Sequence, residues 1–241
     1  MKKLSIVIPC YNESGSLPNL VQVCREACGT REDVEFIFVD NGSSDGTQEI
    51  FKTLLAQPEN KFAKLMHVPI NQGYGYGILQ GLSVAEGEVL AWTHADLQTD
   101  PKDVIIAFDQ FGTILNSGQT IVKGERNGRG LFDVFFTASM SVISSFLLGS
   151  KLWDVNAQPK MFHRSFMKHL DVAPHDFSLD LYVLFVANRL GMKIQSFPVF
   201  FAKREFGEAK GGGNLKGKCK LIKRTFAYIF QLRNDIKKGK R

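Results

Sequence analysis

The feature that most constrains the fold of this sequence is a repeated alternation between short apolar runs and longer segments with helical periodicity. The first run, residues 4–8, is apolar almost throughout, which is typical of a strand buried on both faces of a parallel sheet. Similar runs follow at residues 34–39, 64–68, 89–93, 120–123 and 193–201. This order predicts βαβ units and an α/β fold with a Rossmann-like, mostly parallel sheet.

Segments with helical spacing occupy most of the intervals between these runs. Helices are expected at residues 14–28, 47–55, 71–85, 101–115, 132–147 and 177–190. They are expected to flank the sheet. No internal repeat or low-complexity linker interrupts residues 1–214, so we expect these residues to form one α/β domain.

The last part of the chain, residues 215–241, differs from the rest in charge. It holds ten lysines and arginines against the single acid Asp235, whereas residues 1–214 are mildly acidic. Its apolar residues follow one helical face, at Leu215, Cys219, Ile222, Phe226 and Phe230. This pattern predicts a basic amphipathic C-terminal helix lying on an anionic membrane surface, rather than a nucleic-acid partner. The alternative is a helix packed on the domain with a solvated basic face.

Neither export nor membrane insertion is indicated. No apolar stretch reaches the length of a membrane span, and Pro9 breaks an N-terminal run that is too short for a signal peptide. The cysteines, Cys10, Cys24, Cys28 and Cys219, have neither CxxC nor zinc spacing. We therefore expect a reduced, cytoplasmic protein attached peripherally to the inner face of the membrane.

Polar residues cluster where the expected strands end. The clusters are Pro9–Glu13, Asp40–Thr47, His94–Asp96 and Gly124–Arg126. One such cluster is weak evidence, because strand-to-helix turns favour Gly, Ser and Asp, and Asp45 is expected to act as a turn and capping residue. Four in succession predict a ligand site beyond the carboxyl ends of the strands.

Six segments resemble known sequences. They are SIVIPCYNE (5–13), VDNGSSDGT (39–47), NQGYGYGILQGLSVAEGEVLAWTHADLQTDP (71–101), VKGER (122–126), DVNAQPKMF (154–162) and KREFGEAKGGG (203–213). Together they resemble glycosyltransferase family 2, the inverting enzymes of GT-A fold, and especially the dolichyl- and polyprenyl-phosphate sugar transferases.

The resemblance implies a nucleotide site. Pro9, Tyr11 and Glu13 match residues that hold the base and ribose, and Asp40 matches the acid that contacts the base. Gly73 is expected beside the nucleotide, where close backbone approach suits glycine.

The resemblance also implies residues that handle phosphate. Asp96 matches the second acid of the family's DxD, which holds Mg²⁺ or Mn²⁺ on the donor diphosphate, and Gln98 matches a glutamine that often follows it. Arg126 fits an arginine that reaches phosphates, and Lys203 and Arg204 resemble a basic loop that closes on phosphate oxygens.

His94 departs from the family pattern, which usually has aspartate there. Histidine is a softer ligand than carboxylate and suits Mn²⁺ or later metals better than Mg²⁺. Three interpretations stay open. They are an active enzyme with altered donor contacts, a metal-independent or inactive relative, and a histidine with only a packing role.

The resemblance places acceptor residues near the end of the domain. Asp180 occupies the region where related enzymes keep an acid near the acceptor, with Asp154 and Asp176 as weaker candidates for a catalytic base. The alternative role of Asp180 is stabilisation of a helix N-terminus, together with Ser178, through the helix macrodipole. Gln158 and Lys160 belong to a motif used near the acceptor pocket, and Lys160 could meet an acceptor phosphate or cap a sheet edge.

We therefore expect an inverting glycosyltransferase that uses a UDP- or GDP-sugar and a lipid-linked acceptor, polyprenyl phosphate or a carrier-bound glycan. One alternative is a nucleotidyltransferase, although the first loop, PCYNESGS, lacks the basic residues typical of that class. The other is a nucleotide-sugar-binding pseudoenzyme that scaffolds a polysaccharide-assembly complex.

Overall fold

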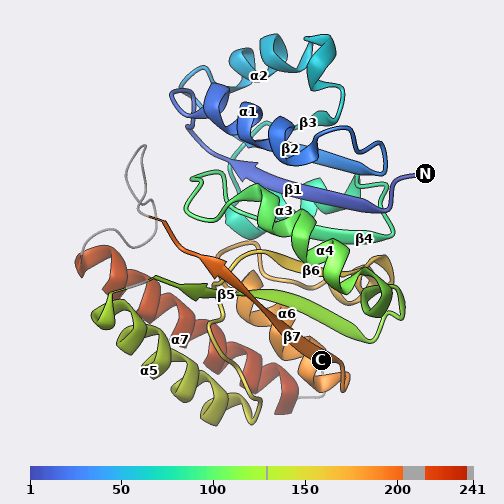
Figure 1. The fold of residues 1–241 in the computed structure, drawn as a ribbon. Helices are drawn as coiled ribbons and strands as arrows, with labels where there is room; N and C mark the ends of the chain where they lie inside the picture. The colour runs from blue at the N-terminus through green and yellow to red at the C-terminus, as the bar shows by residue number, and fades with distance from the viewer. Residues whose placement is uncertain (129, 203–214, 238–241) are drawn as a thin grey trace.

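The computed structural model describes residues 1–128, 130–202 and 215–237, and the strands of this part of the chain form one seven-stranded sheet (Figure 1). The strands are β1 (Leu4–Cys10), β2 (Val34–Asn41), β3 (Ala63–Val68), β4 (Val89–Trp92), β5 (Thr120–Asn127), β6 (Lys160–His163) and β7 (Lys193–Phe200). The α-helices are α1 (Leu17–Cys28), α2 (Thr47–Leu55), α3 (Tyr74–Ser83), α4 (Pro101–Asn116), α5 (Leu131–Leu148), α6 (Leu179–Arg189) and α7 (Leu215–Lys237). Two short 3₁₀ turns are η1 (Pro58–Asn60) and η2 (Arg164–His169).

The strand order is β3-β2-β1-β4-β6-β5-β7, and every strand except β6 runs parallel to the others. This confirms the predicted α/β fold with a mostly parallel sheet. The sequence did not predict β6, a strand of only four residues whose pattern, KMFH, has no strand-like alternation. Because β6 pairs with both β4 and β5, Lys160 lies inside the sheet, and its suggested role as a cap at a sheet edge is wrong.

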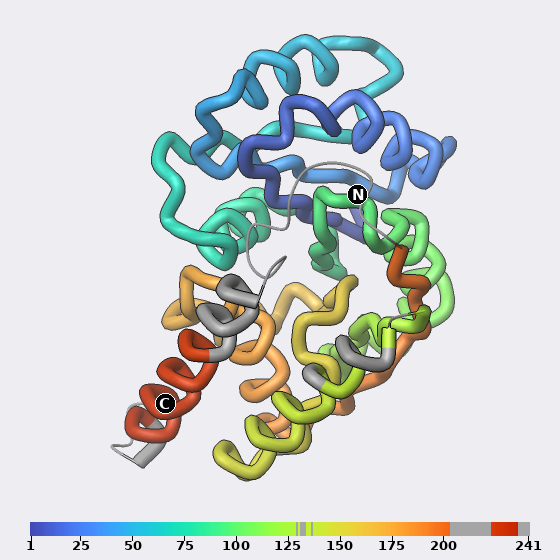
Figure 2. The backbone as a smooth tube through the Cα atoms, turned by 90° about the vertical axis from the view of Figure 1, so that its left-hand side faces the viewer, coloured from blue at the N-terminus to red at the C-terminus, as the bar shows by residue number. Residues whose placement is uncertain are grey.

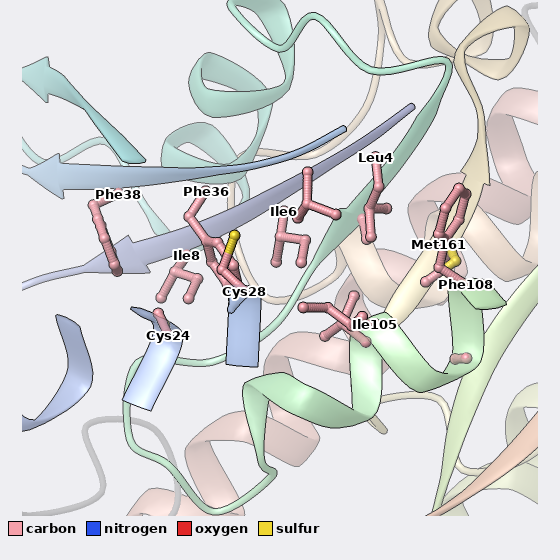
Figure 3. Packing of buried hydrophobic residues seen from close by; sticks show 14 of the residues in the cluster. Leu4, Ile6, Ile8, Cys24, Cys28, Phe36, Phe38, Ile105, Phe108 and Met161 are labelled. Carbon is pink, nitrogen blue, oxygen red and sulfur yellow. The ribbon is translucent and has the colours of Figure 1, made fainter. Parts of the chain in front are cut away.

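Two apolar cores cover the two faces of the sheet. Alternate residues of β1 divide between them: Ile6 and Ile8 face α1 and α4, whereas Val7 faces α3. Figure 3 shows the first core, in which Cys24 of α1 and Ile105 of α4 point towards the strands. The second core contains buried residues of α3, α6 and α7.

Helix starts follow local chemistry. The carboxylate of Asp100 accepts a hydrogen bond from the backbone N–H of Lys102 at 2.8 Å, and Pro101 occupies the first turn of α4. The helix expected from residue 71 begins at Tyr74, because Gly73 has a φ of 117° that no helix accommodates. Thr47 begins α2 as expected, and Asp45 accepts from its N–H and its hydroxyl, which confirms Asp45 as a turn residue. The N-cap position itself is Gly46, so the prediction that Asp45 caps the helix is wrong.

The C-terminal segment forms the expected helix, α7, which lies beside α5 (Figure 1). Tyr228, Ile229 and Leu232 are buried in the second core, so α7 packs on the body of the protein. The proposed division between residues 1–214 and 215–241 stays a prediction. Among the described residues, no helix is both long enough and apolar enough to cross a bilayer.

Candidate active site

The sheet reverses its order beside β1, because the chain proceeds from β1 outward to β2 and β3 and then returns to place β4 on the other side. At such a switch point the loops that leave two neighbouring strands diverge and open a crevice beyond their carboxyl ends. The loop after β1 carries Tyr11 and Glu13, and the loop after β4 carries His94 and Asp96. The fold therefore brings the first and third predicted polar clusters together.

The loops after β1 and β2 are joined by hydrogen bonds between backbone amides and polar side chains. The N–H of Asn12 donates to Ser43 Oγ at 2.9 Å, and Asn12 Oδ1 accepts from the N–H of Ser44 at 2.9 Å. The N–H of Glu13 donates to Thr47 Oγ1 at 3.0 Å. These bonds fix the two loops against each other, while Tyr11 stays exposed and Pro9 half-buried.

Asp40, the predicted base-binding acid, is fully buried at the end of β2. Its Oδ1 accepts from the N–H of Ser43 at 3.1 Å, and its Oδ2 lies 3.0 Å from Nδ1 of His67 on β3. In this structure both oxygens hold the loop and the neighbouring strand. A role for Asp40 in base recognition stays a prediction.

The loop after β4 combines polar side chains with a strained backbone. Leu97 has a φ of +54°, which is rare for a bulky residue, and outliers of this kind occur disproportionately at functional sites. Asp96 is half-buried, and its Oδ1 accepts from the N–H of Gln98 at 3.2 Å. Burial lowers the pKa of His94, with Asp96 acting in the opposite direction, so the ring is neutral at physiological pH.

Gln98 connects this loop to the segment that leaves β7. Its side-chain Nε2 donates to the backbone carbonyl of Ala202 at 3.1 Å, and its backbone carbonyl accepts from the N–H of Ala202 at 2.8 Å. The predicted phosphate-binding residues Lys203 and Arg204 follow directly in the sequence but lie outside the described residues.

The glycines that open α3 lie against a neighbouring backbone, and the predicted place of Gly73 beside the nucleotide stays a prediction. A Cβ atom at Gly73 would lie 2.4 Å from the carbonyl oxygen of His175, and one at Gly75 would lie 2.5 Å from that of Pro174. The close approach therefore comes from the loop before α6. The side chain of Asn41 also binds here, because its Nδ2 donates to the carbonyl of Gly73 at 2.9 Å.

A buried ion pair lies beside β4 and β6. Nζ of Lys160 is 2.7 Å from Oδ1 of Asp180, and neither side chain has more than 1% of its surface exposed. The same oxygen accepts from Nε2 of Gln158 at 2.9 Å, and Gln158 also bonds to the hydroxyl of Tyr74 at 3.2 Å. Burial lowers the pKa of Lys160, whereas Asp180 acts to raise it. Ser178 occupies the N-cap position of α6 without a side-chain hydrogen bond, whereas Asp180 lies in the first turn, where a carboxylate favours the helix N-terminus.

A second ion pair, between the partly exposed Arg126 and the buried Asp154, joins β5 to the loop before β6. The guanidinium of Arg126 binds the carboxylate of Asp154 through Nε and Nη2 and lies over the ring of Phe201, with its Cζ 5.2 Å from the ring centre. Lys123, on the same strand, is also buried, and burial lowers its pKa to about 8. Arg126, predicted to bind phosphate, is thus held by Asp154, one of the weaker candidates for the base.

These groups form one electrostatic cluster. The charges of Asp96, Asp180, Lys160 and Arg126 all act on the pKa of His94. Sequence reasoning identified each of these residues, and the fold brings them together. It missed Lys123 and Tyr74, whose signals were a lysine inside a predicted buried strand and an aromatic residue next to Gly73.

The available ligands fit a metal ion that binds together with a substrate. Among the described residues, no group of three or more His, Cys, Asp or Glu side chains could enclose a cation. Mg²⁺ and similar ions bound to substrate phosphates commonly use only one or two protein carboxylates and keep several waters. The half-buried carboxylate of Asp96 suits that kind of site.

Comparison with known families gives one clear match. The model of the family described as "Glycosyl transferase family 2" matches residues 5–170, well over half of the chain.

Related proteins carry a more specific name. The chain is 28% identical over 212 residues to the undecaprenyl-phosphate 4-deoxy-4-formamido-L-arabinose transferase of Enterobacter sp. (strain 638), a match that covers 86% of this chain and 62% of that protein. It is 29% identical to the protein of the same name from Photorhabdus laumondii, covering 87% of this chain and 63% of that protein. The chain thus spans less than two thirds of the length of these relatives.

Solved structures with the same arrangement include glucosyl-3-phosphoglycerate synthase from Mycobacterium tuberculosis. Its complex with UDP has a TM-score of 0.71 at 17% identity, covering 97% of this chain and 80% of the synthase. Its complex with Mn²⁺, UDP and glucosyl-3-phosphoglycerate has a TM-score of 0.70 at 17% identity, covering 96% and 80%. At this identity the likeness concerns the fold, and it confirms the predicted GT-A arrangement.

Proposed function

Because this chain belongs to glycosyl transferase family 2, we propose that it is an inverting glycosyltransferase acting on a UDP- or GDP-sugar and a lipid-linked acceptor. The observation that carries the proposal is the electrostatic cluster at the switch point. Asp96 follows β4 there, and the ring of His94 lies against Tyr74, whose hydroxyl bonds to Gln158 beside the Lys160–Asp180 pair. This arrangement suits a reaction in which negative charge develops on a leaving diphosphate.

The donor is proposed to lie across the ends of β1, β2 and β4. Pro9, Tyr11, Glu13, Asp40 and Gly73 would hold the nucleotide, with Tyr11 exposed for contact with a ligand. Support comes from the solved synthase, whose complexes contain UDP and Mn²⁺.

Asp96 is the residue proposed to hold Mg²⁺ or Mn²⁺. When bound, the cation would neutralise the charge that develops on the leaving nucleoside diphosphate. His94 and Gln98 would line the same side of the donor, and the neutral ring of His94 adds no further positive charge.

Asp180 is a poor general base in the observed arrangement. Its Oδ1 is paired with the ammonium of Lys160 and the amide of Gln158, and its side chain is only 1% exposed, so a substrate hydroxyl has little access to this carboxylate. A phosphate acceptor is already anionic and needs no base. The pairing therefore favours a polyprenyl phosphate acceptor over a sugar hydroxyl, as the names of the related undecaprenyl-phosphate transferases also suggest. In this proposal Lys160 and Arg126 supply positive charge near the acceptor, and Asp180 and Gln158 position Lys160.

The membrane surface is the proposed setting. On α5, Phe135, Val142 and Phe146 are 67%, 64% and 86% exposed, and their spacing places them on one side of the helix. On the neighbouring α7, Lys223 and Arg233 are exposed. Apolar side chains beside basic ones are what a helix lying on an anionic bilayer requires. We place the protein peripherally on the cytoplasmic face.

The donor proposal is tested by thermal-shift measurements with UDP-, GDP- and dTDP-sugars, with and without Mn²⁺. We expect one UDP- or GDP-sugar to raise the Tm in a metal-dependent way, and Asp96→Ala to abolish that rise. Glu86→Ala is a matched control, because Glu86 is an exposed acid before the amino end of β4 rather than after its carboxyl end. Equal stabilisation of wild type and Asp96→Ala would refute the role of Asp96.

A pseudoenzyme that binds a nucleotide sugar within a polysaccharide-assembly complex is the second candidate, and the histidine at position 94 favours it. Turnover of a nucleotide sugar distinguishes the pseudoenzyme from the active enzyme. Binding of UDP or GDP without any sugar transfer or donor hydrolysis, in Mg²⁺ and in Mn²⁺, would support the scaffold.

A further inference from the structure

Arg224 of the basic helix α7 contacts the loop before α6, which borders the candidate donor site. Its Cζ lies 4.8 Å from the ring centre of Phe177, and its Nε is 3.3 Å from Oδ2 of Asp176. Asp176 and Phe177 belong to the loop before α6. Arg224 thus binds an aromatic ring and a carboxylate at adjacent positions of this loop, and its own side chain is only 34% exposed.

The contact continues as a column of aromatic rings. Phe177 stacks on Tyr74 at the start of α3, with ring centres 4.6 Å apart and planes inclined by 6°. Tyr74 in turn lies beside His94, with ring centres 5.7 Å apart and planes inclined by 30°. Arg224 is therefore three contacts away from the residue that stands where the family usually has an aspartate.

The same loop also fixes the backbone at the start of α3. The N–H of Tyr76 donates to the carbonyl of His175 at 2.9 Å. Gly73 and Gly75 leave no room for a Cβ atom against this loop. A shift of the loop would therefore move both the ring of Tyr74 and the glycine turn proposed to lie beside the nucleotide.

We propose that Arg224 is a positioning residue of the donor site, and that α7 completes this site in addition to contacting the membrane. The assignment of a donor to this site rests on the function proposed above, whereas the mechanical role of Arg224 does not. Arg224 holds Asp176 by charge and Phe177 by stacking, and Phe177 keeps Tyr74 against His94.

The chemistry of arginine predicts a graded response to substitution. Lysine can keep the ion pair with Asp176, but it lacks the planar group that stacks on Phe177. Alanine loses both contacts. Arg233→Ala is the matched control, because Arg233 is exposed on the same helix and its loss changes the net charge by the same amount.

The test uses the full chain and two readouts. Hydrogen exchange measured by mass spectrometry reports on the segments 72–78 and 174–178 without any ligand. We expect exchange in both segments to become about fivefold faster in Arg224→Ala, less so in Arg224→Lys, and to stay unchanged in Arg233→Ala. Calorimetry with UDP and with GDP in Mn²⁺ should show Kd raised by a similar factor in Arg224→Ala.

The outcomes separate the two proposals. Unchanged exchange at 72–78 in a folded Arg224→Ala protein would overturn the positioning role, whatever binds. If exchange rises throughout the chain, the effect is a general loss of stability, and this also counts against the proposal. If wild type binds neither nucleotide, the proposed function fails, while the exchange pattern still decides the role of Arg224.

Discussion

The two halves of the sheet, β1–β3 on one side and β5–β7 on the other, satisfy their buried charged groups in different ways. Figure 2 shows the blue-to-cyan elements β1–β3, α1 and α2 at one end of the molecule and α5–α7 at the other. In the first half, side chains such as Asn12 and Ser43 bond to backbone amides at the surface of the loops. In the second half, Lys160 and Asp180 are buried and bond to each other.

This difference separates two ways of building a binding site. In the first half the buried carboxylates of Glu35 and Asp40 each accept a hydrogen bond from a backbone N–H, so neither depends on a counter-ion alone. Buried charges cost free energy through desolvation, and each depends on its partner. We therefore expect the second half to be far more sensitive to the loss of a single charged group.

The largest expected effect is on the buried pair. Lys160→Met leaves Asp180 without its counter-ion in the interior, and we expect a loss of about 3–5 kcal/mol in the free energy of unfolding, measured with urea. The control in the first half is Arg25→Met, where an arginine with a 39% exposed side chain lies 3.9 Å from the 52% exposed Glu59. That change should cost about 1 kcal/mol or less. Equal losses of unfolding free energy in the two variants would contradict the predicted difference in sensitivity between the halves.

The next effect is a pH dependence that belongs to the second half. Lys123 has a pKa of about 8, below its usual value of about 10.4, so the unfolded chain binds more protons between these two values. Stability should therefore rise with pH from about 8 to about 10.4, by roughly 2–3 kcal/mol from this group. Lys123→Met should remove that rise relative to wild type. If the free energy of unfolding of Lys123→Met rose with pH as much as that of wild type, the rise could not be assigned to Lys123.

A third prediction concerns the boundary between the halves, where α3 meets the loop before α6. Gly75→Ala places a methyl group against three backbone atoms of residues 174–176, and we expect a loss of about 2 kcal/mol. Gly112→Ala, on α4, meets only the ring of Phe108 at 3.5 Å or more and should stabilise the protein by about 0.5–1 kcal/mol. Thermal unfolding of both variants and of wild type measures these changes in stability. A neutral Gly75→Ala would show that the halves are loosely joined.

The smallest effect on stability is expected at the outer surface of α5. Phe146→Ser should change the free energy of unfolding by less than about 0.5 kcal/mol, because this side chain is 86% exposed. It should nevertheless weaken sedimentation with vesicles containing phosphatidylglycerol. Ile70→Ser alters an isolated exposed residue of the first half, 73% exposed, and should leave vesicle binding unchanged. Equal effects of both variants would argue against a membrane face on α5.

The first half of the sheet was predictable because its signals are local. The strands β1, β2 and β4 are continuous apolar runs, and each ends in a polar cluster that the sequence displays directly. A parallel sheet then brings these ends to one edge without further information. The positions of His94 and Asp96 beside the loop after β1 follow from this rule.

The second half was less predictable because its elements depend on distant partners. β6 is a strand only because β4 and β5 provide edges on both sides, and KMFH alone does not indicate it. A lysine at the start of such a strand looks like a surface residue. Its burial becomes understandable only when Asp180, twenty positions later, supplies the opposite charge.

The packing of Gly73 and Gly75 against the loop before α6 was not predictable from the sequence. The predicted place of Gly73 beside a nucleotide stays a prediction. Contacts between segments a hundred residues apart leave no local signal.

Leu97 has a consequence for attempts to engineer a thermostable variant. Its backbone lies in a left-handed conformation that costs about 1–2 kcal/mol for a side chain with a Cβ atom, so a design rule would replace it with glycine. Its side chain, however, packs on the apolar core beneath the loop. Glycine would relieve the backbone, remove this anchor and enlarge the conformational freedom of the segment between His94 and Gln98. Any gain in heat resistance would then come with a less sharply defined place for Asp96, so this position should be left out of a stabilisation library.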